Sequence, residues 1–308
     1  MSPRRKRKKA LFVANPVARG VTPAMVDVIG HALADGLDVE LFRTTGRGSA
    51  RDAAAAAVAN GVDVVVVFSG DGTINEVVNG MVGSGAALGL IPGGATNVLA
   101  RNLGLSEDAL EATSVLIARA AAGEARRLNV GSANGRCFVI NCGAGVDAAL
   151  MRKVEDASPR SRTGHERAAI AGALGITRDY VGRRPDLTVK VDDRPELPAV
   201  SVLVARTSPY AYFKSLQLKI HPEPTELDGG LEVLSVRRLP AKQMPRIAYE
   251  IFTGGNLASR PEMDFAHDAS VVEIGATHPF PVQLDGEYVG EHDALHVEVL
   301  RDALWVLA

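Results

Sequence analysis

The fold of this chain is decided by the stretch Val62-Asp63-Val64-Val65-Val66-Val67-Phe68-Ser69-Gly70-Asp71-Gly72-Thr73-Ile74-Asn75-Glu76. Its first half is a short, β-branched apolar run, which is typical of a strand buried on both faces of a parallel sheet. After the glycines, apolar residues recur at helical spacing, namely Ile74, Val77, Val78, Met81 and Val82. The stretch therefore predicts a strand, a tight glycine turn and the start of a helix.

Such a junction favours the binding of an anion, because backbone N–H groups and the positive end of a helix dipole point at one place. Gly70 and Gly72 let the backbone approach a phosphate without a Cβ in the way. Asp71 between them would repel the phosphate unless a cation such as Mg²⁺, or a strong donor, lies between the two. Taken alone, Gly-Asp-Gly favours an ordinary turn whose aspartate caps a helix.

The phosphate interpretation gains weight because the pattern recurs. Residues 88–91 read as another short buried strand, and the glycine turn 92–97 follows it. Thr96 or Asn97 is expected to cap the next helix. A third candidate turn, 15–20, follows an apolar strand at the start of the chain. Turns on neighbouring parallel strands meet at the carboxyl edge of the sheet, where open α/β sheets bind ligands.

The chain has two regions that differ in their pattern of expected helices and strands. Up to about residue 130, strand-like runs alternate with expected helices at 22–37, 48–61, 74–82, 96–103 and 109–123. This alternation predicts a doubly wound, mostly parallel α/β domain. Extended segments follow at 127–130, 136–141, 187–191, 200–205, 231–236, 271–275, 282–284 and 295–300, with helical interruptions at 167–181 and 241–252. They predict a mostly antiparallel β-domain, so the expected domains are 1–130, joined by 300–308 if the end of the chain returns, and 131–299.

Composition excludes several classes of protein. The chain has 308 residues, 46% hydrophobic content and a net charge of -2, which places it with globular proteins and argues against a general nucleic-acid binder. No apolar run approaches the ~20 residues that span a bilayer, and no secretory signal is expected at the start. Cys137 and Cys142 are expected on opposite faces of one strand as buried, reduced thiols, which suits a cytoplasmic protein. Of the seven histidines, only His292 and His296 have a spacing that could suit a zinc site, and this pair is better interpreted as surface residues near a strand, so no zinc site is expected.

The motifs resemble the diacylglycerol kinase catalytic-domain family, which includes bacterial lipid kinases and the sphingosine and ceramide kinases. The resemblance rests on Asn15-Pro16, residues 70–80, Ile91-Pro92-Gly93-Gly94 with Asn97, Ala100-Arg101 and Asp285-Gly286-Glu287, which lie in the family's order over nearly the whole chain. NAD kinases and phosphofructokinases share the Gly-Asp-Gly core. The continuation Asn75-Glu76 resembles the lipid-kinase branch.

The resemblance implies an ATP-dependent lipid kinase that uses Mg²⁺ and holds the nucleotide in a cleft between the two domains. It implies nucleotide contacts at Asn15, Arg19, Thr44, Ser69, Gly70, Asp71, Gly72, Thr73, Asn75, Gly94 and Thr96. Asp71 and Asp285 are the implied Mg²⁺ ligands, and Glu287, together with Asp71, is the implied catalytic group. Glu76 is expected to stabilise the main turn as a hydrogen-bond acceptor, without contacting the nucleotide itself. Taken alone, Asp285-Gly286 indicates only a hairpin turn.

The sequence departs from the family pattern at three places. Ser69 replaces the usual first glycine of the main turn, and Ala95-Thr96 stands where Thr-Gly is more usual. Gly229 in Leu227-Asp228-Gly229-Gly230 replaces the second aspartate of a turn that holds a structural Mg²⁺ in some bacterial members. That structural metal is therefore in doubt here.

Two other functions stay open from the sequence: phosphorylation of a soluble acceptor such as NAD, and a nucleotide-binding regulator without catalysis. The expected acceptor is a diacylglycerol-like or sphingoid lipid met at a membrane surface, so the expected location is cytoplasmic and peripheral to the membrane. The basic run in residues 3–9 suits either attraction to anionic lipid or a solvated terminus. Residues 209–213 suit either an acyl pocket or plain core, and a homodimer is one candidate assembly.

Overall fold

The computed structural model of this chain describes residues 7–157, 175, 179–213, 216–220, 227–253 and 255–308. Contacts divide the chain into two compact units, which are described separately below. Unit 1 consists of residues 1–130 and 301–308, and unit 2 of residues 131–300. The chain passes between them within two strands, β5 (Arg126–Ala133) and β16 (Glu287–Val306).

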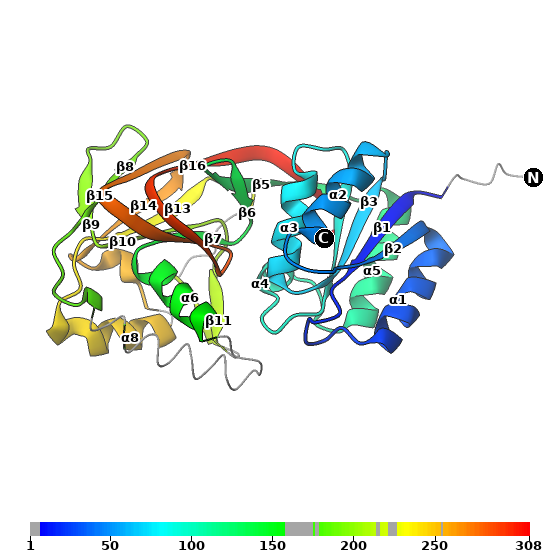
Figure 1. Ribbon diagram of the computed structural model, residues 1–308, viewed down its shortest axis with the longest axis horizontal. Coiled ribbons are helices and arrows are strands. Elements are labelled where there is room, and N and C mark those ends of the chain that lie inside the picture. The colour runs from blue at the N-terminus through cyan, green and yellow to red at the C-terminus, as the bar shows by residue number, and fades with distance from the viewer. Residues whose placement is uncertain (1–6, 158–174, 176–178, 214–215, 221–226, 254) are drawn as a thin grey trace, which may run out of the picture. The chain divides into compact units, whose positions relative to one another are not determined.

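Unit 1 alternates strands and helices, as the sequence predicts (Figure 1). Its elements are β1 (Lys9–Ala14), α1 (Pro23–Gly36), β2 (Asp38–Arg43), α2 (Ser49–Ala59), β3 (Val64–Ser69), α3 (Asp71–Met81), β4 (Ala87–Pro92), α4 (Val98–Asn102) and α5 (Ala109–Ala122). The strands pair in the order β4-β3-β1-β2, and every pair is parallel. The end of β16 adds a further parallel strand beside β4. Helices α1 and α5 pack on each other, as do α2 and α3. The predicted doubly wound sheet is confirmed.

The local sequence explains the elements of unit 1. Every residue of β3 and β4 is buried, in keeping with their apolar composition. Helix α1 begins with Pro23 after Thr22, whose hydroxyl accepts the N–H of Met25 at 3.2 Å. Helix α5 ends at Gly123, where a φ of 76° suits glycine.

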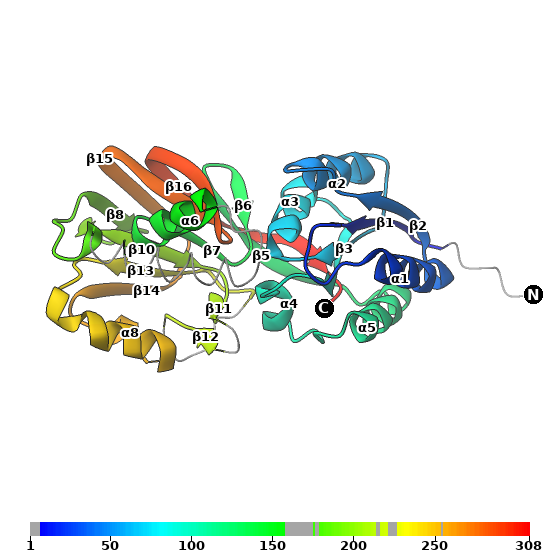
Figure 2. The ribbon, with the colours of Figure 1, turned by 60° about the horizontal axis from the view of Figure 1, so that its bottom comes forward.

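Unit 2 is built from antiparallel strands (Figure 2). Its further strands are β6 (Arg136–Phe138), β7 (Asn141–Ala144), β8 (Leu187–Val191), β9 (Leu197–Ala199), β10 (Ser201–Ala205), β11 (Ala211–Phe213), β12 (Leu216–Leu218), β13 (Leu231–Val236), β14 (Met263–Ala269) and β15 (Val271–Leu284). The strand order is β14-β13-β10-β7-β15-β16, with β8 and β9 continuing from β15, and β11 and β12 form a separate pair. The predicted antiparallel domain is confirmed.

Two features of unit 2 differ from the expectations. The single strand expected at 136–141 is two strands, so Cys137 lies on β6 and Cys142 on β7. Both thiols are nevertheless buried and unbridged, as expected. A helix that the sequence analysis did not predict, α6 (Val146–Asp156), packs on β7, β10 and β15. Most of the helix expected at 167–181 lies outside the described residues.

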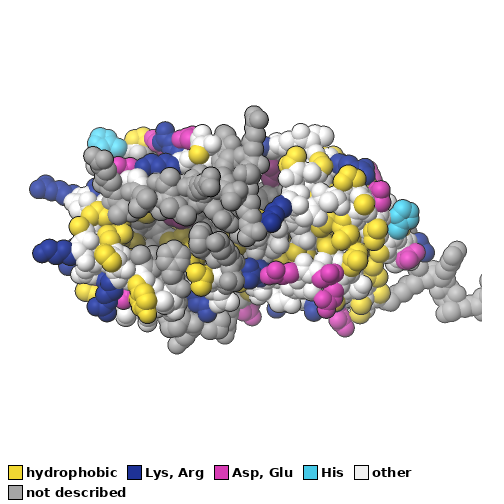
Figure 3. All heavy atoms as spheres, turned by 90° about the horizontal axis from the view of Figure 1, so that it is seen from below, with side chains coloured by type: hydrophobic (Ala, Val, Ile, Leu, Met, Phe, Trp, Pro, Cys, Tyr) yellow, Lys and Arg dark blue, Asp and Glu magenta, His cyan; other side chains and the backbone are white. Residues whose placement is uncertain are grey.

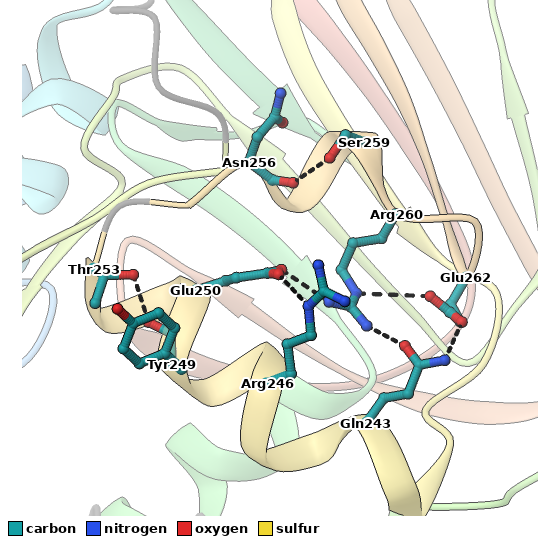
Figure 4. A network of polar contacts seen from close by, with 9 residues as sticks. All are labelled: Gln243, Arg246, Tyr249, Glu250, Thr253, Asn256, Ser259, Arg260 and Glu262. Carbon is teal, nitrogen blue, oxygen red and sulfur yellow. Dashed lines mark hydrogen bonds and ion pairs between the residues drawn. The ribbon is translucent and has the colours of Figure 1, made fainter.

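The helical segment expected at 241–252 consists of a short 3₁₀ turn (Ala241–Gln243) and α8 (Met244–Thr253). Figure 4 shows how the buried Arg260, just after a second 3₁₀ turn (Leu257–Ser259), holds this segment. Its guanidinium donates to Glu250 at 2.9 Å and to Gln243, and lies 3.6 Å from Glu262. The polar network therefore fastens α8 to unit 2. Tyr249 of α8 is 68% exposed. Lys and Arg side chains stand out at the end of unit 2 that lies on the left in Figure 3.

Candidate functional site

The candidate phosphate site lies at the carboxyl edge of the parallel sheet in unit 1. Asn15 follows β1, Thr44 follows β2, Gly70 follows β3 and the turn 93–97 follows β4. Because these strands are parallel, all four segments lie at the same edge. The strand order reverses direction between β1 and β3, which is the position where doubly wound sheets bind ligands.

The hydroxyl of Thr73 ties the first two turns together. It accepts a hydrogen bond from the side-chain amide of Asn15 at 2.9 Å and one from the hydroxyl of Ser69 at 2.9 Å. The side-chain oxygen Oδ1 of Asn15 accepts the N–H of Val17 at 3.1 Å, which shapes the turn after β1. Ser69, which replaces the family's usual glycine, is thus buried and uses its hydroxyl inside the site.

Glycines let the main turn and the turn after β4 approach each other closely. A Cβ added to Gly94 would lie 2.5 Å from the Cα of Gly70, and one added to Gly70 would lie 3.0 Å from the Cα of Gly94. The N–H of Gly20 donates to the carbonyl of Gly93 at 2.8 Å, which brings in the turn after β1. The three glycine-bearing turns therefore form one constellation.

Asp71 links two of these turns through its carboxylate. Its Oδ2 accepts the N–H of Val98 at 3.0 Å and the hydroxyl of Thr96 at 3.1 Å, and its Oδ1 accepts the N–H of Leu99 at 3.2 Å. Burial raises the pKa of Asp71, and these hydrogen bonds oppose that rise. Asp71 is thus the side chain that caps α4.

This geometry corrects the expected cap of α4. Asn97 occupies the N-cap position, but it is in the left-handed conformation, with a φ of 46°, and its side chain makes no cap. The side-chain oxygen Oδ1 of Asn97 instead accepts the N–H of Gly94 at 2.8 Å. The hydroxyl of Thr96 donates to Asp71 and likewise does not cap the helix. Neither of the two expected residues caps α4, because the first backbone N–H groups of the helix, those of Val98 and Leu99, already donate to Asp71.

The other residues expected at this site take different positions. Glu76 accepts the N–H groups of Gly48 at 2.8 Å and Ala50 at 3.1 Å, so it secures the start of α2 rather than its own turn. Asn75 is buried in α3 and accepts from the amide of Asn79. Arg19 is exposed, and Thr44 donates its N–H to Ala14 at 3.0 Å. Their nucleotide contacts stay predictions.

The acidic hairpin of unit 2 joins β15 to β16. Its two turn residues have positive φ angles, 50° at Asp285 and 84° at Gly286, which suits the Asp-Gly pair. Leu284 pairs with Glu287 across the turn. Oδ1 of the buried Asp285 accepts the N–H groups of Ile140 at 2.8 Å and Asn141 at 3.0 Å, and its Oδ2 accepts that of Val139 at 2.9 Å. Asp285 therefore fixes the bend between β6 and β7.

Glu287 lies beside a cation of the same unit. Its Oε2 is 3.4 Å from Nη2 of Arg136 on β6, and its side chain is 29% exposed. The carboxylate of Glu287 is therefore partly buried and still in contact with solvent.

Sequence reasoning missed a polar cluster under this hairpin. The fully buried Gln283 donates to Asn141 at 2.5 Å and to Asp147 at 2.6 Å, and it accepts the N–H of Gly286 at 2.8 Å. Burial raises the pKa of Asp147 to about 6, against the hydrogen bond from Gln283. The signal available in the sequence is Gly143-Ala144-Gly145 between an apolar run and α6, the same strand–glycine–helix pattern as in unit 1.

The turn that holds Gly229 is bound by the positively charged side chain of Arg206. The guanidinium of Arg206, only 1% exposed, donates to the carbonyls of Leu227 at 2.7 Å, Gly229 at 2.9 Å and Gly230. In the part of the chain that the structure describes, no group of three or more His, Cys, Asp or Glu residues is placed to hold a metal ion. A metal ion at Asp71, or at the turn 227–230, would therefore need further ligands that these side chains do not supply.

Comparisons with known proteins match both halves of the chain. The family model described as the diacylglycerol kinase catalytic domain matches residues 9–133. The model described as the YegS C-terminal NAD kinase beta sandwich-like domain matches residues 141–308. The second model alone covers more than half of the chain.

Curated relatives and solved structures carry related names. A protein of Bacillus subtilis called diacylglycerol kinase is 28% identical over 264 residues, which are 83% of this chain and 81% of that protein. One of Staphylococcus saprophyticus with the same name is 25% identical over 92% of this chain and 90% of its own length. A crystal structure titled a putative diacylglycerol kinase, from Bacillus anthracis, has a TM-score of 0.75 at 22% identity, covering 99% of this chain and 98% of its own; it is similar in fold.

Proposed function

Since the chain belongs to the diacylglycerol kinase catalytic-domain family, whose members are phosphotransferases with an alcohol group as acceptor, we propose that it is an ATP-dependent lipid kinase. The observation that carries the proposal is the constellation of three glycine-bearing turns around Thr73 in unit 1. Phosphoryl transfer is mostly positioning and charge stabilisation, so a site built from close backbone turns suits it.

Unit 1 is the proposed nucleotide-binding domain. The start of α3 directs backbone N–H groups and a helix dipole toward the carboxyl edge of the sheet, which favours a phosphate there. No N-cap side chain covers these groups, because Gly70 is the N-cap. Asn15, Thr73 and Gly94 line the same edge. Arg19 and Thr44, at the ends of the neighbouring turns, are proposed further contacts to ATP.

The residues present fit a Mg²⁺ ion that is bound jointly with ATP. Mg²⁺ usually takes one or two protein carboxylates and completes its shell with phosphate oxygens and water, so a cage of several acidic residues is not required. Asp71 lies at the phosphate turn and would hold the ion, directly or through water, and Asp285 is the second proposed ligand. Bound Mg²⁺ would neutralise the charge of the β- and γ-phosphates.

Glu287 is the proposed general base. It would take the proton of the acceptor hydroxyl while that oxygen forms a bond to the γ-phosphorus and the bond to the β–γ bridging oxygen breaks, which leaves ADP and the phosphorylated lipid. Arg136 beside it orients the carboxylate. Asp285 and Gly286 hold Glu287 on a hairpin of defined geometry, which suits a group that must meet one proton.

The proposed acceptor is a diacylglycerol-like or sphingoid lipid, met by unit 2 at a membrane surface. None of the helices in the described ranges has the length and apolar content of a membrane span. The exposed aromatic ring of Tyr249 and the basic Lys242 and Arg246 on the α8 segment would suit contact with an anionic interface.

The test is a transfer assay with γ-labelled ATP. The full chain is offered diacylglycerol, ceramide and a sphingoid base in mixed micelles, and NAD without detergent, with and without Mg²⁺. We expect label in one lipid only, and only with Mg²⁺. Label in NAD alone would assign a soluble acceptor, and binding of ATP without any transfer would assign a regulator; either result would overturn the proposal.

A further inference from the structure

Gln283 uses every hydrogen-bonding group of its side chain beneath the acidic hairpin. Its Oε1 accepts the N–H of Gly286 at 2.8 Å. Its Nε2 donates one hydrogen to Oδ1 of Asn141 at 2.5 Å and the other to Oδ2 of Asp147 at 2.6 Å. Since the side chain is fully buried, no water replaces a lost partner at low cost.

The partners of Gln283 allow its amide one orientation only. A backbone N–H can only donate, so the group facing Gly286 must be the oxygen. The nitrogen then faces two oxygens, of which the carboxylate of Asp147 can only accept when ionised. Asn141 is oriented in turn because its Nδ2 donates to the carbonyl of Tyr210 at 3.0 Å. Asp147 therefore helps to select the orientation that holds Gly286.

The fold makes room for this pair. Asp147 is in the first turn of α6, where the N–H of Val146 donates to the hydroxyl of Ser201 at 3.1 Å. Gly143 lies under both side chains, and a Cβ there would be 2.7 Å from Nε2 of Gln283 and 2.8 Å from Oδ2 of Asp147. Burial raises the pKa of Asp147, so its charge costs stability. A costly carboxylate, in a space that only a glycine at position 143 leaves open, indicates a role beyond packing.

We propose that Asp147 is a positioning residue that acts through Gln283 to fix the hairpin on which Glu287 stands. The path has three steps: Asp147 orients the amide of Gln283, that amide holds the N–H of Gly286, and Gly286 directly precedes Glu287. The inference deepens the proposed function and rests on it, because it names a group that determines where the base lies.

The first test separates turnover from nucleotide binding. Asp147→Ala is expected to lower kcat about 10- to 100-fold, as displacement of a catalytic group by about an ångström does, while KM for ATP stays within about twofold. Asp147→Asn keeps an acceptor for Gln283 and is expected to retain kcat within about threefold. Asp156→Ala, at the exposed end of the same helix, is the matched control. Wild-type kcat in Asp147→Ala, or no rescue by Asp147→Asn, would overturn the proposal.

The second test needs no substrate and so stands apart from the kinase assignment. Amide hydrogen exchange at Gly286 is measured by NMR in the wild-type chain and the same variants. Exchange should be faster in Asp147→Ala and unchanged in Asp147→Asn and Asp156→Ala; unchanged exchange in Asp147→Ala overturns the positioning role. Asp147→Ser, whose hydroxyl is too short to meet Gln283, replaces the alanine variant if that one does not fold. If the wild-type chain transfers no phosphate while exchange responds as expected, the proposed function alone fails.

Discussion

Asp71 stands at the start of one helix, and its carboxylate caps another: its Oδ2 accepts the N–H of Val98, the first residue of α4, at 3.0 Å. The two residues belong to the glycine turns after β3 and β4. One side chain therefore fixes the spacing of two turns and also carries the charge proposed to hold Mg²⁺. Structural and catalytic effects of its replacement must be measured separately.

Replacement of Asp71 by alanine is expected to lower stability and to abolish turnover. The loss of a helix cap costs about 1 kcal/mol, within a range of roughly 0.5–2 kcal/mol. The free energy of unfolding is measured with denaturant, and transfer is assayed well below the unfolding midpoint. Asp108→Ala, which removes the cap of α5 from the N–H groups of Leu110 and Glu111, is the control. It should cost a similar free energy but keep turnover; equal turnover in both variants would speak against a catalytic part for Asp71.

The sequence predicts unit 1 well because its signals are local. The apolar run of β3, the glycines and the helical spacing that begins at Ile74 all lie within about twenty residues, and each agrees with the element observed. What it does not predict is which side chain serves which helix. Asp71 caps α4 across a separation of 27 residues, and the two local candidates, Thr96 and Asn97, do not.

Unit 2 is predicted less well because distant contacts decide its local structure. Residues 136–141 read as one apolar strand, yet the strand bends at Val139 and Ile140. The bend exists because the carboxylate of Asp285, 145 residues away from Ile140, accepts hydrogen bonds from the backbone N–H groups there. No local pattern contains this information, so the helix α6 and the residue Asp147 that follow the bend were missed as well.

Glu287→Gln is expected to lower kcat by at least about 100-fold while ATP still binds, because an amide accepts no proton but fills the same space. Transfer is followed with labelled ATP, and nucleotide affinity by titration calorimetry. Glu291→Gln is a matched control, since Glu291 lies on the same strand and also faces an arginine, Arg152, at 2.7 Å. Near-normal turnover of Glu287→Gln would reject Glu287 as the base.

Arg206→Met is expected to destabilise the protein by about 3 kcal/mol, because it leaves three carbonyls of the turn 227–230, that of Gly230 buried, without their donor. The unfolding midpoint of the wild-type chain should not change with EDTA, since the guanidinium supplies the positive charge at this turn. Arg238→Met, at an exposed position, serves as the control. A midpoint that falls on chelation would show that a structural metal persists despite Gly229.

The ionisation of Asp147 predicts a pH dependence of stability. Its pKa is raised from 3.8 to about 6, first by burial, so between these values the folded chain holds a proton that the unfolded chain has lost. The contribution of Asp147 to stability is therefore most favourable below about pH 4 and declines as the pH rises to about 6, by up to roughly 3 kcal/mol.

Asp147→Asn removes this dependence, so its unfolding free energy, relative to the wild-type chain, should rise between pH 4 and 7. The groups facing Asp147 are Cys142 and Tyr210, which stay neutral in this range because their pKa values are raised too. Parallel pH profiles of the two chains, measured by urea unfolding, would contradict the buried, ionised carboxylate on which the orientation of Gln283 depends.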